Sequence, residues 1–316
     1  MKKIVVIGMV LFLVLAVGAF ARSSAERVRL ATGGTTGTYY AFGTAMAQTL
    51  QEITGVNFTV QSTGASVANI QLIDRGEVEM AIVQNDTMDY AWRGVDQFAA
   101  DKSYRSFAAM AGIYMEVSHI VTNTASGVTS IADLRGKRVS VGDAGSGTEL
   151  NTRHILEAYG LSFNDINVQN LGVGPSADAL RNNQIDAFFF TAGPPTSAIT
   201  DLATSANIVF LEVDSTRAAT LNQRYPFYTS FSIPANTYRG QTTPVQTVGI
   251  KATLIVKGDL PETTVYNLTK ALFENSSRIS HAKSAEISAA SAVQGMGSVP
   301  WHPGAARYYR EIGAIR

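Results

Sequence analysis

Two glycine- and threonine-rich loops, residues 31–40 and 143–148, hold the side chains best suited to bind a small polar ligand. Glycine lets the backbone approach a ligand closely, and the hydroxyls of threonine and serine form hydrogen bonds. Each loop runs into a segment with helical spacing, and the free N–H groups and positive dipole end of a helix start favour an anion. The residues expected to contact the ligand here are Thr35, Gly37, Thr38, Tyr39, Ser146, Gly147 and Thr148.

Further candidates follow predicted strands or lie in a segment that joins the two halves of the chain. For Asp86, which follows a strand, a turn or helix N-cap explains the residue as well as ligand binding does. Glu116 lies with His119 in an extended segment, and Phe190 stands at the end of a mostly buried strand. These candidates are Ser62, Gly64, Ala65, Gln84, Asp86, Glu116, Phe190 and Gly193.

The motifs of phosphate-binding and hydrolytic enzymes are not found in the chain. A Walker A loop needs Gly-Lys-Ser/Thr, but Gly136 and Lys137 are followed by Arg138. Leu150 replaces the third glycine of GxGxxG, and the glycines beside Ser146 are adjacent to it, whereas GxSxG needs them two residues away. There is no cysteine, no HExxH motif and no two-histidine metal spacing. We therefore predict a binding protein with no catalytic centre, metal or cofactor.

The two loops occupy equivalent places in two similar halves of the chain, each with strands that alternate with helices. This alternation predicts parallel sheets, in which ligands bind outside the carboxyl ends of the strands. The predicted elements of the first half are strands at 28–31, 58–61 and 80–83 and helices at 39–53 and 66–75. Those of the second half are strands at 139–142, 166–169 and 185–190 and helices at 148–159 and 176–182.

Two extended apolar segments, 110–123 and 247–257, are predicted to cross between the halves and to hold the hinge. The prediction is an α/β protein of two lobes with a ligand cleft between two parallel-core sheets. Lobe I comprises residues 27–119 and 251–316, and lobe II comprises residues 120–250. Helices in the C-terminal part are predicted at 261–279, 282–293 and 303–312.

The N-terminus has the pattern of a secretory signal peptide. A short basic stretch at Met1–Lys3 precedes the uncharged residues 4–20, and Ala19-Phe20-Ala21 supplies an A-x-A cleavage pattern. A membrane anchor is the alternative, since this apolar run is just long enough to span a bilayer. We predict cleavage after Ala21 and a periplasmic mature protein. The net charge of zero gives no basic field for nucleic acid.

Five segments of the chain resemble the TAXI solute receptors, the extracytoplasmic binding proteins of one branch of the TRAP transporters. The resemblance extends from about Leu30 to Arg310. The segments are ATGGTTGTYYAFG, STGASVANIQLIDRGEVEMAIVQND, GDAGSGTELNTRHILEAYGL, DAFFFTAG and HPGAARYYRE.

The resemblance implies a type II periplasmic binding fold that closes on a solute and delivers it to TRAP permease subunits in the membrane, with transport driven by a sodium gradient. The implied solutes are glutamate, glutamine or related dicarboxylates such as 2-oxoglutarate. The sister branch of TRAP receptors holds a carboxylate with an arginine; the resemblance assigns no equivalent here, and neutral hydroxyls and helix N-termini are expected to hold the anion instead. The implied ligand contacts are Thr35, Thr38, Tyr39, Ser62, Gly64, Gln84, Ser146, Gly147 and Thr148.

Two other functions fit a bilobal scaffold. One is a periplasmic sensor that signals to a membrane kinase, which the neighbouring genes would distinguish from a transport receptor. The other is an enzyme on the same fold, against which the missing catalytic motifs argue.

Overall fold

The computed structural model describes residues 27–100 and 102–316. The predicted signal peptide, residues 1–21, lies outside the described residues. In the part of the chain that is described, no helix is long and apolar enough to cross a membrane.

Ten strands form one hydrogen-bonded sheet in the order β2-β1-β3-β10-β4-β7-β5-β6, with β8 added to β4 and β9 added to β10. The strands at either end of this order run parallel, β2-β1-β3 at one end and β7-β5-β6 at the other. The strands are β1 (Arg27–Ala31), β2 (Asn57–Gln61), β3 (Met80–Gln84), β4 (Phe107–Asn123), β5 (Arg138–Ser140), β6 (Asn167–Gln169), β7 (Ala187–Ala192), β8 (Ile208–Phe210), β9 (Thr229–Ile233) and β10 (Val245–Lys257).

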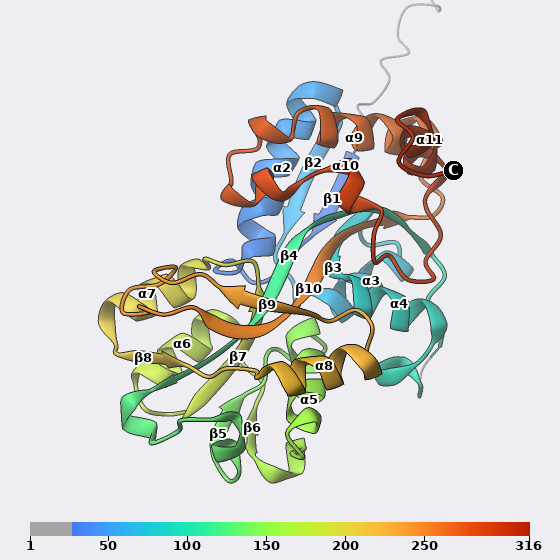
Figure 1. The fold of residues 1–316 in the computed structure, drawn as a ribbon. Helices are drawn as coiled ribbons and strands as arrows, with labels where there is room; N and C mark the ends of the chain where they lie inside the picture. The colour runs from blue at the N-terminus through green and yellow to red at the C-terminus, as the bar shows by residue number, and fades with distance from the viewer. Residues whose placement is uncertain (1–26, 101) are drawn as a thin grey trace, which may run out of the picture.

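The long strands β4 and β10 are the two predicted crossings, and they connect the upper and lower bodies of the molecule (Figure 1). They pair with each other in antiparallel fashion. Beyond this pairing, β10 bonds to β3 and β4 bonds to β7, so the crossings hydrogen-bond to an inner strand of each parallel group. The two parallel cores predicted from the sequence are therefore joined into one continuous sheet.

Helices cover both faces of the sheet (Figure 1). In α2, Phe42, Met46 and Leu50 are fully buried, and Gly55 ends the helix in the left-handed conformation. The helices are α2 (Thr38–Thr54), α3 (Ser66–Asp74), α4 (Asn85–Arg93), α5 (Gly147–Ala158), α6 (Val173–Arg181), α7 (Ser197–Ser205), α8 (Ser215–Arg224), α9 (Glu262–Glu274), α10 (Ala289–Ala292) and α11 (Pro303–Glu311). Short 3₁₀ turns are η1 (Asp96–Phe98), η2 (Thr124–Ser126), η3 (Ile131–Leu134), η4 (Phe163–Asp165), η5 (Ser276–Arg278) and η6 (Ala282–Glu286).

The strand and helix alternation predicted for both halves is confirmed, with two local differences. Helix α6 begins at Val173, so the predicted loop at 172–175 is mostly its first turn, where Pro175 is tolerated because the N–H group it lacks has no partner there. The predicted helix at 282–293 is divided into η6 and the single turn of α10. Helices α4, α7 and α8 were not predicted.

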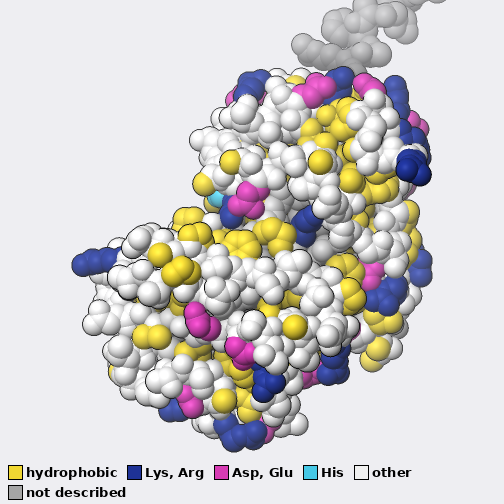
Figure 2. Space-filling model, viewed as in Figure 1, with side chains coloured by type: hydrophobic (Ala, Val, Ile, Leu, Met, Phe, Trp, Pro, Cys, Tyr) yellow, Lys and Arg dark blue, Asp and Glu magenta, His cyan; other side chains and the backbone are white. Residues whose placement is uncertain are grey.

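The buried apolar residues form clusters that follow the two parallel groups. Two clusters centre on β1–β3, one of them with α2, α9 and α11 and the other with α3 and α4. Two others centre on β5–β7 with α5 to α8. The lobe boundaries remain a prediction. The names lobe I and lobe II are used below for the predicted residue ranges, 27–119 with 251–316 and 120–250. In Figure 2, hydrophobic side chains gather where the two bodies meet.

Candidate functional site

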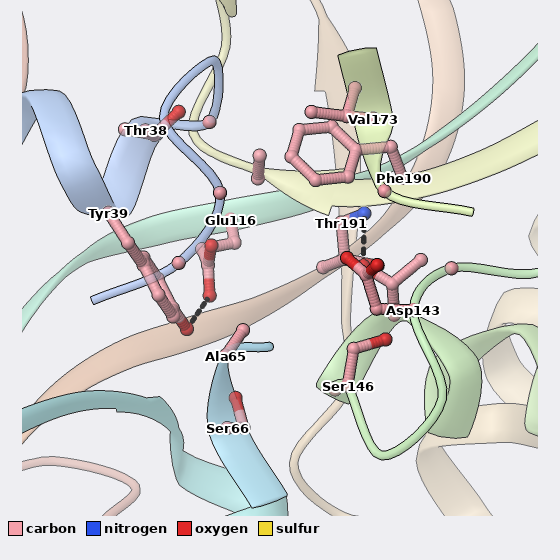
Figure 3. Close-up of a pocket in the computed structure, with 18 of the residues that line it drawn as sticks. Thr38, Tyr39, Ala65, Ser66, Glu116, Asp143, Ser146, Val173, Phe190 and Thr191 are labelled. Carbon is pink, nitrogen blue, oxygen red and sulfur yellow. Dashed lines mark hydrogen bonds between the residues drawn. The ribbon is translucent and has the colours of Figure 1, made fainter. Parts of the chain in front are cut away.

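A pocket lies between the lobes and takes residues from both of them (Figure 3). The lining residues are Gly33, Gly34, Gly37, Thr38, Tyr39, Ala65, Ser66, Gln84, Glu116, Gly142, Asp143, Ser146, Gly147, Thr148, Leu171, Gly172, Val173, Phe190, Thr191 and Ala192.

Four helices begin at the wall of this pocket: α2 and α3 from lobe I, and α5 and α6 from lobe II. The first N–H groups of a helix have no partner within the helix, and side chains usually cap them. Helices α2, α3 and α6 begin without a side-chain cap, whereas Ser146 caps α5 by accepting a hydrogen bond from Glu149 N. The pocket is thus surrounded by helix starts that favour a negative group.

Glu116 lies where β4 passes from one lobe to the other, opposite Ile250 of β10. Its side chain is 1% exposed and accepts a 2.6 Å hydrogen bond from the Tyr39 hydroxyl (Figure 3). Burial raises the pKa of the Glu116 carboxyl to about 8, despite the opposing effect of this hydrogen bond. Burial, together with the Glu116 charge, also raises the pKa of Tyr39. At neutral pH the burial of this side chain therefore favours protonated Glu116.

A second carboxyl group, that of Asp143, points into the pocket from lobe II (Figure 3). Burial raises the pKa of Asp143 as well. Within the described structure, no group donates a hydrogen bond to its carboxyl oxygens, and none of the residues lining the pocket is lysine, arginine or histidine. The charged side chains of the lining are therefore two carboxyl groups.

Gln84, at the end of β3, reaches across to the start of α5. Its side chain is 2% exposed, and Oε1 has no hydrogen-bond partner in the described structure. A Cβ atom on Gly147 would overlap Oε1 of Gln84, so only glycine fits opposite Gln84 in this arrangement. A buried polar atom without a partner at a pocket wall indicates that a ligand or water supplies the missing bond.

Hydrogen bonds cross from one lobe to the other around the pocket, so the structure is a closed form. The bonds run from Thr38 Oγ1 to Gly193 O at 2.9 Å, from Ser197 Oγ to Thr36 O at 2.9 Å and from Val67 N to Gly145 O at 3.2 Å.

A second group of contacts between the lobes lies outside the pocket lining. Asn151 Nδ2 donates to Asp86 Oδ2 at 3.1 Å and to the Tyr228 hydroxyl at 2.9 Å. His154 lies between the Tyr228 hydroxyl and Asp96 Oδ2, 3.1 Å from each. Burial raises the pKa of Asp86 to about 6, although His154 and hydrogen bonds act in the opposite direction. We call Asp86, Asp96, Asn151, His154 and Tyr228 the rear network.

Most of the predicted ligand residues are brought to the pocket wall. These are Gly37, Thr38, Tyr39, Ala65, Gln84, Glu116, Ser146, Gly147, Thr148 and Phe190. Their place in the wall agrees with the prediction, and ligand contact by each of them remains a prediction.

Five predicted residues do not line the pocket, each for a visible reason. Thr35 is exposed at the outside of its loop. Ser62 and Gly64 lie beside the pocket loop, with Ser62 Oγ donating to Gly33 O at 3.0 Å. Asp86 is fully buried in the rear network, and Gly193 presents its carbonyl to Thr38.

Lining residues that sequence reasoning did not select come mainly from lobe II. Asp143 lies in a predicted loop in which the neighbouring hydroxyl and glycine residues carry the stronger ligand signal. Leu171 and Val173 carry no polar signal, and the sequence predicts no ligand role for the loop that contains Gly172. The strand end after Phe190 could have indicated Thr191, whose backbone N donates to Thr148 Oγ1 at 3.2 Å.

Ala65 lies at the pocket wall with φ 66° and ψ −144°, a conformation that is normally restricted to glycine. It precedes α3, and its backbone turns the chain so that Ser66 Oγ accepts a 3.1 Å hydrogen bond from Gln84 N. The strained turn therefore helps to place Gln84.

No group of three or more histidine, cysteine, aspartate or glutamate side chains in the described residues is arranged to hold a metal ion. His119 is fully buried, with Nδ1 3.2 Å from Phe190 O and Nε2 2.9 Å from the Tyr238 hydroxyl. Burial lowers the pKa of His119 to about 4. The described histidines thus give no sign of a metal centre.

The comparison with protein families matches residues 30–313 to the NMT1-like family. The chain belongs to the NMT1-like family. This match includes both pocket loops, both crossing strands and the C-terminal helices, so family membership covers the whole bilobal unit.

Solved structures with a similar fold include a protein of Bordetella bronchiseptica, with 17% identity and a TM-score of 0.57 over 92% of this chain and 81% of that one. The aliphatic sulphonate binding protein SsuA of Escherichia coli has 16% identity and a TM-score of 0.50 over 91% and 84%. The binding protein of a phosphonate ABC transporter of Pseudomonas aeruginosa has 12% identity and a TM-score of 0.51 over 83% and 77%. At these identities the likeness concerns the fold, and the predicted bilobal periplasmic-binding architecture is confirmed.

Proposed function

We propose that this protein is a periplasmic solute-binding receptor that captures a small carboxylate or amino acid and delivers it to a membrane permease. The observation that carries the proposal is the pocket between the lobes, where four helix starts from both lobes meet. Two proteins that share the fold support it, because SsuA is described as a periplasmic sulphonate binding protein and the Pseudomonas aeruginosa protein as the binding component of a phosphonate transporter.

A carboxylate fits the helix starts better than a neutral group does. Each helix start presents roughly half a positive charge together with free N–H donors. The starts of α2, α3 and α6 have no side-chain cap, so their first N–H groups are left to bind an oxygen of the ligand. The hydroxyl of Thr38 lies beside the start of α2, and those of Ser146 and Thr148 lie beside the start of α5.

The finer assignment, a TAXI-type receptor of a TRAP transporter, rests on the sequence resemblance. The segments that carry it include residues 31–43 and 142–161, which contain the starts of α2 and α5 at the pocket. Delivery to TRAP permease subunits and glutamate, glutamine or 2-oxoglutarate as solute are proposed on the same basis.

Solute binding moves the protein toward the closed form only if the solute binds that form better than the open one. The lobes are connected through β4 and β10, so we expect the hinge near the Glu116–Ile250 pair, where these strands change their bonding partners.

The test is calorimetric titration of the mature protein, residues 22–316, after unfolding and refolding to remove copurified solute. Small carboxylates and amino acids are expected to bind with 1:1 stoichiometry and to compact the protein in small-angle scattering. Absence of binding by any small acid or amino acid would refute the proposal. Mass spectrometry of the solute released on unfolding would identify the physiological class.

A further inference from the structure

The charges of the pocket are opposite to those expected of a site built for a dicarboxylate. Glu116 and Asp143 are its charged side chains, and no lysine, arginine or histidine is among the described lining residues. Lys283 acts on Glu116 electrostatically, but it does not line the pocket, and its Nζ pairs with Glu286 Oε1 at 2.6 Å. A second carboxylate of the solute would therefore meet two carboxyl groups and no cationic side chain among the described lining residues.

Both carboxyl groups have acceptor capacity that the protein leaves unused. Tyr39 donates to Glu116 Oε2, and among the described residues no donor reaches Oε1. Asp143 has no donor at either oxygen in the described structure. Gln84 Oε1, 2% exposed and without a partner, is a further unsatisfied oxygen of the same wall. Unused acceptors at a pocket wall call for a ligand that donates hydrogen bonds.

The helix starts and the carboxyl groups together suit a zwitterion. Glu116 projects from β4 at the floor, while the starts of α2, α5 and α6 surround the rest of the cavity (Figure 3). An α-amino acid carries one carboxylate for a helix start and one ammonium group with three N–H donors for the acceptors. A 2-oxo acid of the same skeleton has a carbonyl in place of that ammonium and only adds acceptors.

We propose that the solute is an α-amino acid whose ammonium group is attracted by the two carboxyl groups of the pocket, those of Glu116 and Asp143. This inference rests on the proposed function and selects amino acids over the oxo acids and dicarboxylates within it. Glu116 is then a specificity-determining residue. Its side chain is only 1% exposed, so its charge acts within the pocket and not at the outer surface.

Matched pairs of solutes test the inference on ligand-free mature protein by titration calorimetry. The pairs are L-glutamate with 2-oxoglutarate, L-alanine with pyruvate, and L-leucine with 4-methyl-2-oxopentanoate. The amino acid of at least one pair is expected to bind 100-fold or more tightly than its partner. An oxo acid that binds as tightly as its amino acid would overturn the inference and leave the receptor function standing. No binding by any pair, with binding of another acid, would also overturn it.

Charge-removing variants locate the ammonium site. Glu116→Gln and Asp143→Asn should each weaken amino-acid binding about 10- to 100-fold, with no loss of affinity for the 2-oxo acid. Glu77→Gln, at an exposed glutamate outside the lining, is the matched control. Circular dichroism and thermal unfolding check that each variant folds. Wild-type amino-acid affinity in both folded pocket variants would overturn the assignment.

The pH dependence of affinity distinguishes an ammonium from a carboxylate beside Glu116. An ammonium binds the ionised carboxyl, so amino-acid affinity should rise up to tenfold per pH unit from pH 6 to 8, as the cost of releasing the proton decreases. A carboxylate would need protonated Glu116, and affinity would then fall above pH 8, which would overturn the inference. Several charged or titratable groups interact electrostatically with Glu116. They are Tyr39 of α2, Tyr114 of β4, Asp86 of α4 and Lys283 of η6, which is paired with Glu286.

Discussion

The side chain of Gln84 in lobe I lies directly against the backbone of Gly147 in lobe II. A Cβ atom on Gly147 would overlap Oε1 and Cδ of Gln84 and lie 3.0 Å from its Nε2. Gln84 is 2% exposed and therefore has little space to move aside in this closed form. This contact shows how closely the two lobes approach each other in the closed form.

Gly147→Ala should hinder closure while leaving the open form intact. Alanine favours the helix more than glycine by up to ~1 kcal/mol, so the free energy of unfolding of the ligand-free protein should change by about 1 kcal/mol or less. Solute affinity, measured by calorimetry, should fall at least tenfold. Gly258→Ala is the control, because a Cβ atom there meets its first neighbour at an ordinary 3.4 Å. Wild-type affinity in Gly147→Ala would show that Gln84 can reorient.

Thr38→Val removes a hydrogen bond that exists only when the lobes meet. The hydroxyl of Thr38 donates to Gly193 O of lobe II at 2.9 Å. A hydrogen bond of this kind contributes about 1 kcal/mol, so affinity should fall roughly fivefold with thermal stability of the ligand-free protein nearly unchanged. Thr44→Val, which loses a bond within α2, serves as the control. An equal loss of affinity in both variants would contradict the proposed role in closure.

The ligand-free protein should lose stability as the pH rises toward 8. Glu116 titrates near 4.5 in the unfolded chain and at about 8 in the folded protein, because burial disfavours its charge. Between these values the folded state binds the extra proton, so the free energy of unfolding decreases with rising pH. From pH 6 to 8 the wild type should lose on the order of 2 kcal/mol relative to Glu116→Gln.

Urea unfolding of both ligand-free proteins at pH 6, 7, 8 and 9 measures this difference. Asp86 titrates at about 6 and His119 at about 4, so neither dominates the window from pH 7 to 9. Parallel pH profiles for the wild type and Glu116→Gln would contradict the raised pKa of Glu116.

Asn151→Ala should weaken solute binding from outside the pocket. Asn151 of lobe II donates to Asp86 Oδ2 of lobe I at 3.1 Å, and loss of this donor leaves a buried carboxyl oxygen unsatisfied in the closed form. Loss of about 1–2 kcal/mol from the closed state corresponds to roughly 5- to 30-fold weaker binding. Asn167→Ala, which loses a bond within lobe II, is the control. Small-angle scattering at saturating solute should still show the compact form, and affinity equal to the control would refute a role of the rear network in closure.

Ala65→Gly should stabilise the protein. Ala65 has φ 66° and ψ −144°, which strains an alanine by about 1–3 kcal/mol, whereas glycine adopts this conformation freely. The greater freedom of glycine in the unfolded chain offsets about 0.4–1 kcal/mol of the gain. We expect a net increase of roughly 1 kcal/mol in the free energy of unfolding, measured by urea denaturation. A less stable variant would show that the methyl group contributes packing that outweighs the strain.

The sequence by itself determined the local elements and the class of fold. Phe42, Met46 and Leu50 recur at helical spacing and Gly55 ends their helix, because both features depend on neighbours within a turn or two. The two glycine-rich loops could be placed at strand ends before helices for the same reason, which brought Thr38, Ser146 and Gly147 into the predicted site. The apolar crossings at 110–123 and 247–257 also gave the two-lobe plan.

Only the tertiary structure decided which side chains share the cleft and with what charge. Asp86 and Gln84 are two residues apart, yet one enters the rear network and the other the pocket, since the direction of a side chain at a helix start depends on what packs against it. Asp143 and Glu116 are 27 positions apart in the chain, yet both line one cavity, because β4 carries Glu116 to it and the loop before α5 carries Asp143 to it. Such contacts between distant segments depend on how the lobes close, which local spacing does not record.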